Sequence, residues 1–547
     1  QTVKLVEMQS EAGAIGAAHG ASETGSLCTS FTASQGLMLM IPVMHRLAGE
    51  LKPIVLHIAA RTVGTHTMSI FGDHSDVMGC RNTGWAMLCS ASVQECADLA
   101  AVAHLATIKG RVPFMHFFDG FRTSHEIQKI QMLPAEELGK LIDRKALYDF
   151  KHTGLNPEHP VMRSTVTNPD MFFQSREANN LWYQRLPYIV QDYMDQIGEL
   201  TGRPYHLFDY YGAPDAEHVV VAMGSVTGAI QETIDKLSKD GKKVGFLQVR
   251  LYRPFSLEHF MKAMPDTVRT ITVMDRTKEP GALGEPLYED VCAAVSHIKQ
   301  DVTVLACRYG LSSKDVPPAA INAVFNNMEA LQPKNHFTLG IIDDVTHLSM
   351  PDIPIAVDTE GTISCKFWGF GSDGTVGANK NSIKIIGDNT DMYVQAYFEY
   401  DTKKSGGVTK SHLRFGTNPI RATYYVKAAD FLACHKQAYM DTYDIVSEIK
   451  EGGIFLLNCN WDKADVANHL SNKVKRQLAA NHVKFYIINA TKIAEEIGLG
   501  SNRTNTVLQA AFFKLANIMP IDDAVKHMKD AIAKTYLAKG EQVISMN

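Results

Sequence analysis

Apolar runs of strand length alternate with amphipathic stretches along most of the chain, which is the pattern of an α/β protein. LCTSFTA, residues 27–33, predicts a strand that leads into an amphipathic helix with Ser34 as its N-cap. PIVLHIAAR then predicts a buried strand ending at Arg61, and the unit repeats in MLCSAS, VQECADLAAVAHLATIKG and VPFMHFFDG. We therefore expect a first parallel-sheet domain over residues 1–205, in which residues 150–200 form an irregular excursion.

Two further α/β domains are expected after this one. HVVVAMGSVTGAIQETIDKLSKDGKKVGFLQV predicts a strand, a helix and a strand that form one βαβ crossover, and TITVMDR and VTVLACR add strands to a domain over residues 206–355. A third domain, residues 356–547, opens with ISCKFWGF and continues with the apolar runs MYVQAYF, ATYYV, GIFLLN and VKFYIIN. The predicted fold class is α/β, with three parallel-sheet domains.

The composition is that of an ordinary globular protein. The 547 residues carry 45% hydrophobic and 21% charged residues and a net charge of -5, which favours neither disorder nor binding to nucleic acid. We expect no membrane span, because no apolar run reaches about 18 residues. The chain begins at Gln1, within the approach to a predicted helix, so we expect the native start, and any transit peptide, to lie before it.

The nine cysteines are scattered and form no C-x-x-C pair. This spacing favours buried or inert thiols in the cytoplasm or another reducing compartment, including an organelle. It also argues against an iron–sulfur or zinc site built from this chain alone, so we predict no metal site from its own side chains.

A glycine-rich turn, Gly369–Gly374, follows the first predicted strand of the third domain and precedes a helix. Its backbone N–H groups, over Gly371, Ser372, Asp373, Gly374 and Thr375, could hold a phosphate, although a purely structural turn has the same pattern.

A pair of lysines follows the next predicted strand. Lys403, Lys404 and Ser405 are expected at the same edge of the sheet, where they would suit a phosphorylated ligand, or else form a solvated loop. Coenzyme A, flavin and NAD all remain open on this pattern.

Two charged residues of the first domain stand in unusual surroundings. Glu11 lies among small residues in EAGAIGAAHGA, which let a helix approach another body closely, so it is either a surface glutamate or an acid with a functional partner. Arg61 ends an apolar strand and is either an ion-pair residue or a bidentate clamp for a carboxylate. No G-x-S-x-G, H-E-x-x-H or P-loop motif is present, and His66, His74 and His104 are taken as structural.

Several longer stretches resemble a known family. EMQSEAGAIGAAHGA, SIFGDHSD, VPFMHFFDGFRTSHEIQKI, DRTKEPGALGEPLY, FWGFGSDGTVGANKNSIKIIGDNTD and YDTKKSGGVTKSHLRFG are similar, in order and along essentially the whole chain, to pyruvate:ferredoxin (flavodoxin) oxidoreductase. The resemblance covers what look like the first three domains of that enzyme: a transketolase-like pyrimidine-binding domain, a transketolase carboxyl-terminal-like domain and a Rossmann-like coenzyme A-binding domain. The family's later domains, with the site for Mg²⁺ and diphosphate and three [4Fe–4S] clusters, are not matched in this sequence.

The resemblance implies roles for individual residues. Glu11 matches the glutamate that hydrogen-bonds N1′ of the aminopyrimidine of thiamin diphosphate, and Arg61 matches the arginine that holds the carboxylate of the 2-oxo acid. The turn from Gly371 to Thr375 and the loop from Lys403 to Ser405 are placed near the phosphates of coenzyme A.

The implied reaction is the oxidative decarboxylation of pyruvate to acetyl-CoA and CO₂ by a homodimer, with electrons passed to ferredoxin or flavodoxin. We expect this chain alone to be inactive. The alternatives are a related oxidoreductase for a larger 2-oxo acid and a coenzyme A-binding module without redox chemistry.

Overall fold

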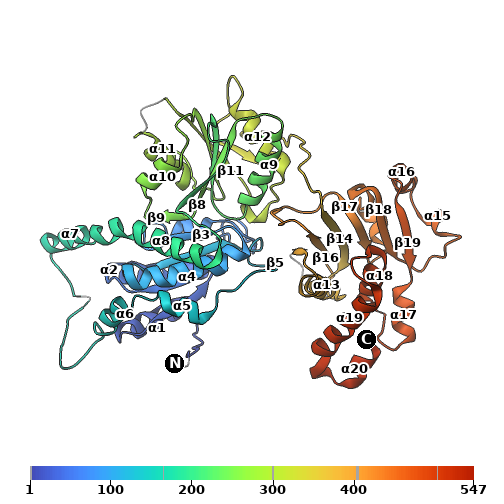
Figure 1. The fold of residues 1–547 in the computed structure, drawn as a ribbon, viewed down its shortest axis with the longest axis horizontal. Helices are drawn as coiled ribbons and strands as arrows, with labels where there is room; N and C mark the ends of the chain where they lie inside the picture. The colour runs from blue at the N-terminus through green and yellow to red at the C-terminus, as the bar shows by residue number, and fades with distance from the viewer. Residues whose placement is uncertain (1–2, 164, 298–300, 402–405, 502) are drawn as a thin grey trace. The chain divides into compact units, whose positions relative to one another are not determined.

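The computed structural model describes residues 3–163, 165–297, 301–401, 406–501 and 503–547 (Figure 1). The chain divides into two compact units. Unit 1 comprises Gln1–Ser124, Ile130–Asp358 and Arg421–Tyr424, and unit 2 comprises His125–Lys129, Thr359–Ile420 and Tyr425–Asn547.

Unit 1 contains two sheets. The first has the strand order β1 (Cys28–Thr32), β2 (Ile54–Ala60), β4 (Phe114–Asp119), β3 (Ala86–Ser90) and β9 (Leu251–Arg253). Its first four strands run parallel, and only β9 is antiparallel to its neighbour. The carboxyl ends of β1, β2 and β4 therefore meet at one edge, where loops of α/β sheets commonly form binding sites.

The second sheet of unit 1 is also mostly parallel. Its strand order is β13 (Ser349–Met350), β12 (Phe337–Leu339), β11 (Thr303–Arg308), β10 (Thr270–Asp275), β7 (His218–Ala222), β8 (Val244–Val249) and β6 (Phe208–Gly212). Strands β7 and β8 are parallel neighbours joined by a helix, which confirms the predicted βαβ crossover. Only β6 is antiparallel. One continuous apolar core includes residues of both sheets, among them Phe114 of β4 and Val219 of β7.

Helices connect the strands of both sheets. In chain order they are α1 (Glu11–Glu23), α2 (Ser34–Gly49), α3 (Ser75–Gly79), α4 (Val93–Gly110), α5 (Ala135–Leu141), α6 (Arg144–Lys151), α7 (Pro169–Ala178), α8 (Asn180–Thr201), α9 (Thr227–Lys239), α10 (Leu257–Ala263), α11 (Pro286–Val295) and α12 (Pro318–Met328), with the short 3₁₀ turn η1 (Leu311–Ser313).

The third sheet lies in unit 2. Its strand order is β19 (Lys484–Ile488), β18 (Ile449–Asn458), β17 (Ala429–Cys434), β14 (Thr362–Phe370), β16 (Val408–Gly416), β15 (Tyr393–Tyr400) and β5 (Ile127–Gln128). Strands β14, β17, β18 and β19 run parallel, but β16 is antiparallel to both of its neighbours, and β5 is antiparallel to β15.

The α/β class is thus confirmed, but the expectation of a parallel third sheet was wrong for its β16 side. The reason is the short connection between Tyr400 of β15 and Val408 of β16. So few residues can join two neighbouring strands only as an antiparallel hairpin, because a parallel crossover needs a dozen or more.

The helices of unit 2 are α13 (Thr375–Asn389), α14 (Tyr439–Thr442), α15 (Val466–His469), α16 (Asn472–Ala480), α17 (Ala490–Glu496), α18 (Asn505–Ala516), α19 (Ile521–Tyr536) and α20 (Glu541–Met546), with the 3₁₀ turns η2 (Val446–Glu448) and η3 (Leu537–Lys539). Among the described residues of the chain, no helix is both long and apolar enough to cross a bilayer.

Candidate functional site

Glu11 is the first residue of α1, directly after the N-cap Ser10, whose hydroxyl accepts a hydrogen bond from the N–H of Gly13 at 3.4 Å. The Glu11 side chain is exposed and, among the residues described, makes no hydrogen bond or ion pair. It lies against Gly36 in the first turn of α2, where an added Cβ would come within 2.7 Å of the Glu11 Cγ and 2.8 Å of its Oε1. The absence of a side chain at Gly36 therefore makes room for the carboxylate.

Two glycines of α1, Gly16 and Gly20, have open space beside them. A Cβ added to Gly16 or Gly20 would meet nothing within 4 Å in the described part of the chain. Close approach of another body to α1 stays a prediction.

Asp76, a residue that the sequence reasoning missed, organises the neighbourhood of both predicted catalytic residues. Its buried Oδ2 accepts the backbone N–H of Ser34 at 2.7 Å and that of Arg61 at 3.0 Å, and its Oδ1 accepts the N–H of Val77 at 2.7 Å. Burial raises the pKa of this carboxyl to about 7, against the lowering effect of the three N–H donors. The only available signal was its place in SIFGDHSD, a stretch that matches no catalytic or binding motif.

This arrangement corrects the predicted cap of α2. Ser34 is the first residue of the helix, with φ of 55°, and the residue at the N-cap position is Ala33, which makes no side-chain cap. The Ser34 hydroxyl instead donates to the carbonyl of Thr62 at 2.5 Å, and its N–H is held by Asp76. The start of α2 is therefore fixed to the end of β2.

Arg61 follows β2 and is half-buried. Its guanidinium lies over the ring of Phe121, 5.0 Å from the centroid, and Phe121 in turn packs on Phe71 with a centroid separation of 4.8 Å. The Arg61 Nε is buried without a hydrogen-bond partner, and the side chain forms no salt bridge within the described residues. An ion-pair role, one of the two interpretations that the sequence left open, therefore has no partner residue among those described.

The structure thus brings Glu11 and Arg61 to the same edge of the first sheet. Glu11 contacts residue 36, and the backbone of Arg61 shares the carboxylate of Asp76 with residue 34. A charged network of Asp119 lies at the end of the neighbouring strand β4, where Asp119 binds His74 at 2.5 Å and Arg276 at 2.5 Å. Burial alone would raise the pKa of Asp119, but Arg276 and His74 hold it well below its ordinary value.

The glycine-rich turn of unit 2 lies between β14 and α13, as predicted. Ser372 and Gly374 have φ of 79° and 85°. The carboxylate of Asp373 accepts the N–H of Phe370 at 2.9 Å and that of Thr375 at 2.8 Å, so it occupies one of the N–H groups predicted to hold a phosphate, that of Thr375. Any anion bound at this turn must use the remaining N–H groups.

The turn is adjacent to the hairpin that follows β15. The N–H of Gly371 donates to the carbonyl of Gly407 at 2.8 Å. The predicted lysine loop, Lys403, Lys404 and Ser405, lies outside the described residues.

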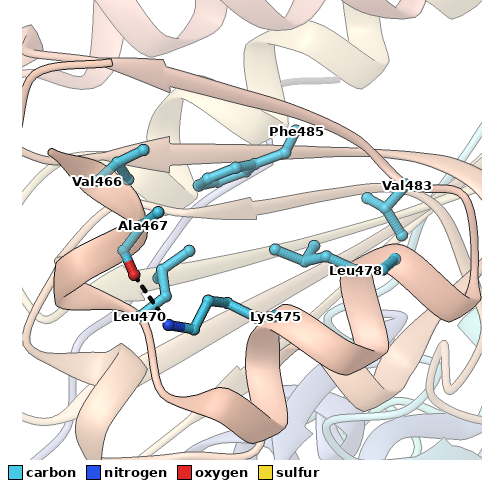
Figure 2. A pocket seen from close by; sticks show the side chains of 8 residues that line it. Val466, Ala467, Leu470, Lys475, Leu478, Val483 and Phe485 are labelled. Atoms are coloured by element: carbon cyan, nitrogen blue, oxygen red, sulfur yellow. Dashed lines mark hydrogen bonds between the residues drawn. The ribbon is translucent and has the colours of Figure 1, made fainter. Parts of the chain in front are cut away.

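A separate apolar cavity of about 330 Å³ lies between α15, α16 and β19 (Figure 2). Among its lining side chains Lys475 is the one that carries a charge, and its Nζ donates to the carbonyl of Ala467 at 3.1 Å. The cavity contains none of the residues predicted to contact coenzyme A.

Comparison with protein families assigns most of the chain. Residues 1–195 match the family described as "Pyruvate flavodoxin/ferredoxin oxidoreductase, thiamine diP-bdg". Residues 216–321 match "Pyruvate:ferredoxin oxidoreductase core domain II", and residues 364–547 match "Pyruvate ferredoxin/flavodoxin oxidoreductase".

Curated relatives match along the full chain. It is 57% identical to the pyruvate:ferredoxin oxidoreductase of Moorella thermoacetica and 55% identical to the pyruvate-flavodoxin oxidoreductase of Enterobacter agglomerans, in each case over 100% of this chain and 47% of the relative. It is 50% identical to the pyruvate dehydrogenase [NADP(+)] of Cryptosporidium parvum, over 100% of this chain and 29% of the relative.

The chain spans about half the length of the first two of these relatives. Because three family matches follow one another in order and the relatives align from end to end of the chain, it belongs to the pyruvate:ferredoxin/flavodoxin oxidoreductase family.

Proposed function

We propose that this chain supplies the aminopyrimidine-binding and 2-oxo acid-binding residues of a thiamin diphosphate-dependent pyruvate oxidoreductase. The observation that supports this best is the placement of Glu11 and Arg61 at one sheet edge, each without a partner for its charged group among the described residues. An isolated carboxylate and an isolated guanidinium at one edge suit a ligand with a basic heterocycle and a substrate with a carboxylate.

Glu11 fits the ring nitrogen of the cofactor. A carboxylate that accepts a hydrogen bond from N1′ of an aminopyrimidine favours the tautomer with a basic exocyclic nitrogen, so Glu11 would set the proton position on the ring. The space at Gly36 lets the carboxylate lie flat against α2. When bound, thiamin diphosphate supplies an electron sink for the decarboxylation of a 2-oxo acid.

Arg61 fits the substrate carboxylate. Its planar fork can donate two parallel N–H bonds, and the Phe121 ring beneath it restricts the guanidinium to one plane without neutralising its charge. The orphaned Nε is a donor that a bound carboxylate would satisfy.

The remaining assignments follow from the family and are also part of this proposal. Unit 2 would bind coenzyme A near the Gly371–Thr375 turn and residues 403–405, and Mg²⁺ and the [4Fe–4S] clusters would be held by other parts of the enzyme. Electrons would pass to ferredoxin or flavodoxin, the acceptors in the names of two relatives, and the enzyme would act as a homodimer. The three domains would divide near residues 205 and 355.

The test is a pair of substitutions in the intact oxidoreductase. Glu11→Gln should lower the rate of pyruvate decarboxylation about 100-fold or more, since a neutral amide cannot bias the ring tautomer as a carboxylate does. Arg61→Lys should raise the KM for pyruvate about 10- to 100-fold, because one charged hydrogen-bond pair is lost.

Glu7→Gln, which changes an exposed acid four residues before Glu11, is the matched control and should leave both constants unchanged. Coenzyme A binding, measured by calorimetry, should be the same in all three variants. Full decarboxylation activity in Glu11→Gln would overturn the assignment.

A further inference from the structure

A loop from the second sheet of unit 1 is hydrogen-bonded to the loop that follows Arg61. The first of these, the 309–315 loop, follows β11 and contains Ser312 and Ser313, whose φ values are 54° and 56°. Its partner, the 62–73 loop, runs from Arg61 to the start of α3.

Ser313 makes the central contacts. Its backbone N–H donates to the carbonyl of Gly72 at 2.7 Å, and its side-chain Oγ accepts the N–H of Gly72 at 2.8 Å. Ser313 and Gly72 are both buried, so each lost bond would leave a polar group without water. At the exposed end of the same contact, the hydroxyls of Ser69 and Ser312 lie 2.6 Å apart.

From Gly72 the contact continues to Arg61 through backbone that has no side chain to absorb a shift. A Cβ on Gly72 would lie 2.1 Å from the carbonyl oxygen of Gly120, and a Cβ on Gly120 would lie 2.4 Å from the carbonyl oxygen of Ala60 and 3.0 Å from the Arg61 Cγ. Gly72, Gly120 and Arg61 are therefore stacked in direct contact. A displacement of Gly72 moves the surface on which the Arg61 side chain rests.

The 309–315 loop is itself fixed by hydrogen bonds from two buried arginines. The Arg122 guanidinium donates to the Ser313 carbonyl at 3.2 Å and to Asp315 at 3.1 Å. The Arg276 Nε donates to the carbonyl of Gly310 at 3.1 Å, while its Nη1 binds Asp119. These buried charged bonds connect the loop to the end of β4.

We propose that Ser313 is a positioning residue for Arg61: it fixes Gly72, and through Gly120 the guanidinium, in the place where the carboxylate of a 2-oxo acid binds. The inference rests on the function proposed above, because it takes Arg61 as the carboxylate-binding residue. It gives the second sheet a part in substrate binding.

The experiment uses Ser313→Gly in the intact oxidoreductase. Glycine tolerates the positive φ and keeps the N–H bond to Gly72, so the fold is retained while the hydroxyl is lost. We expect the KM for pyruvate to rise about 5-fold, corresponding to one hydrogen bond, with the KM for coenzyme A unchanged. Ser296→Ala, an exposed serine whose hydroxyl bonds within its own helix turn, is the matched control and should change neither constant.

A double-mutant cycle separates positioning from general destabilisation. In an Arg61→Lys background, Ser313→Gly should raise the KM for pyruvate no further, whereas a merely structural effect would multiply. Hydrogen exchange of the peptide covering residues 62–73 gives a readout that does not depend on turnover and should become faster in Ser313→Gly.

The outcomes distinguish the two proposals. If Arg61→Lys leaves the KM for pyruvate unchanged, the proposed function fails. If Arg61→Lys raises it but Ser313→Gly does not, or if the two effects multiply, the positioning role of Ser313 is overturned.

Discussion

At the scale of single residues, the site depends on what is absent beside each charged group as much as on the group itself. Glu11 lies where Gly36 leaves a gap, and Arg61 rests on Gly120 and Phe121 without meeting an acid among the described residues. A half-buried charge without an internal partner, such as that of Arg61, is costly to maintain, and such charges are common where a ligand supplies the partner.

The gap at Gly36 gives a direct prediction. In Gly36→Ala the new Cβ would collide with the Glu11 side chain, which can move away because it is flexible. We expect decarboxylation to fall at least 10-fold, while the thermal midpoint changes little, since alanine also favours the helix by about 0.5–1 kcal/mol.

Gly49→Ala, in the same helix with nothing within 4 Å of the new Cβ, is the control and should keep full activity. Equal activity in both variants would show that the Glu11 position is unimportant. The two measurements are steady-state rates and thermal unfolding.

Part of this site could be predicted from sequence and part could not. Glu11 and Arg61 stood out in the sequence because a charge among small or apolar residues is locally anomalous, but their roles were implied only by the family resemblance and stay predictions. Asp76 was not, because its function is to accept N–H bonds from residues 34 and 61, and those contacts exist only after folding. Ser313 escaped notice for the same reason, since its partner Gly72 is distant in the sequence.

At the scale of elements, regular periodicity was a reliable guide. The helix predicted from VQECADLAAVAHLATIKG is α4, residue for residue. Helix α8 was missed because Asn and Pro at its start suggested an irregular segment, although its buried Leu186, Val190 and Ile197 follow a helical spacing. ATYYV, predicted as a strand, is irregular: a strand needs a neighbour as well as an apolar pattern, and this run has none in the described sheets.

Three histidine side chains of the first domain, His57, His104 and His116, contact one another. His57 of β2 and His116 of β4 are register partners with their Nδ1 atoms 2.9 Å apart, and the His57 Nε2 lies 3.1 Å from the Nε2 of His104 on α4. Burial, followed by the neighbouring His104, lowers the pKa of His57 to about 4, and burial also lowers the pKa of His104 and His116. All three rings are therefore neutral near pH 7, which agrees with the structural role expected for His104.

The three buried histidines predict that the folded protein loses stability in acid. The unfolded histidines take up protons as the pH falls through about 6.5, whereas the folded His57 does so only near pH 4, so the free energy of unfolding should decrease between these values. Each such histidine contributes a slope of up to about 1.4 kcal/mol per pH unit. His104→Gln should reduce the slope measured by denaturant unfolding between pH 7 and 5.

The exposed His45 provides the comparison, and His45→Gln should leave the slope as it is in the parent. A slope that is identical in the parent and His104→Gln would contradict the interpretation.

At the scale of the whole molecule, the chain consists of two units with separate apolar cores. We expect Asp119→Asn to destabilise only unit 1, by about 3–5 kcal/mol, because it leaves the buried Arg276 without its counter-charge. Thermal unfolding followed by hydrogen exchange should show earlier loss of protection in unit 1 and an unchanged midpoint for residues 425–501.

Ser225→Ala tests the specificity of that effect. It removes a hydroxyl that accepts from Arg276 at 3.2 Å but leaves the counter-charge in place, so its effect should be much smaller. A uniform loss of protection across both units in Asp119→Asn would refute independent unfolding.

The contact of Gly72 with Gly120 has a consequence for how the family can vary. Any side chain at either position would collide with main-chain oxygen atoms, which cannot rotate away as a side chain can. A relative that replaces one of these glycines has therefore rebuilt the backbone under its arginine. The 2-oxo acid specificity of such an enzyme should be measured directly, because membership of the family does not establish it.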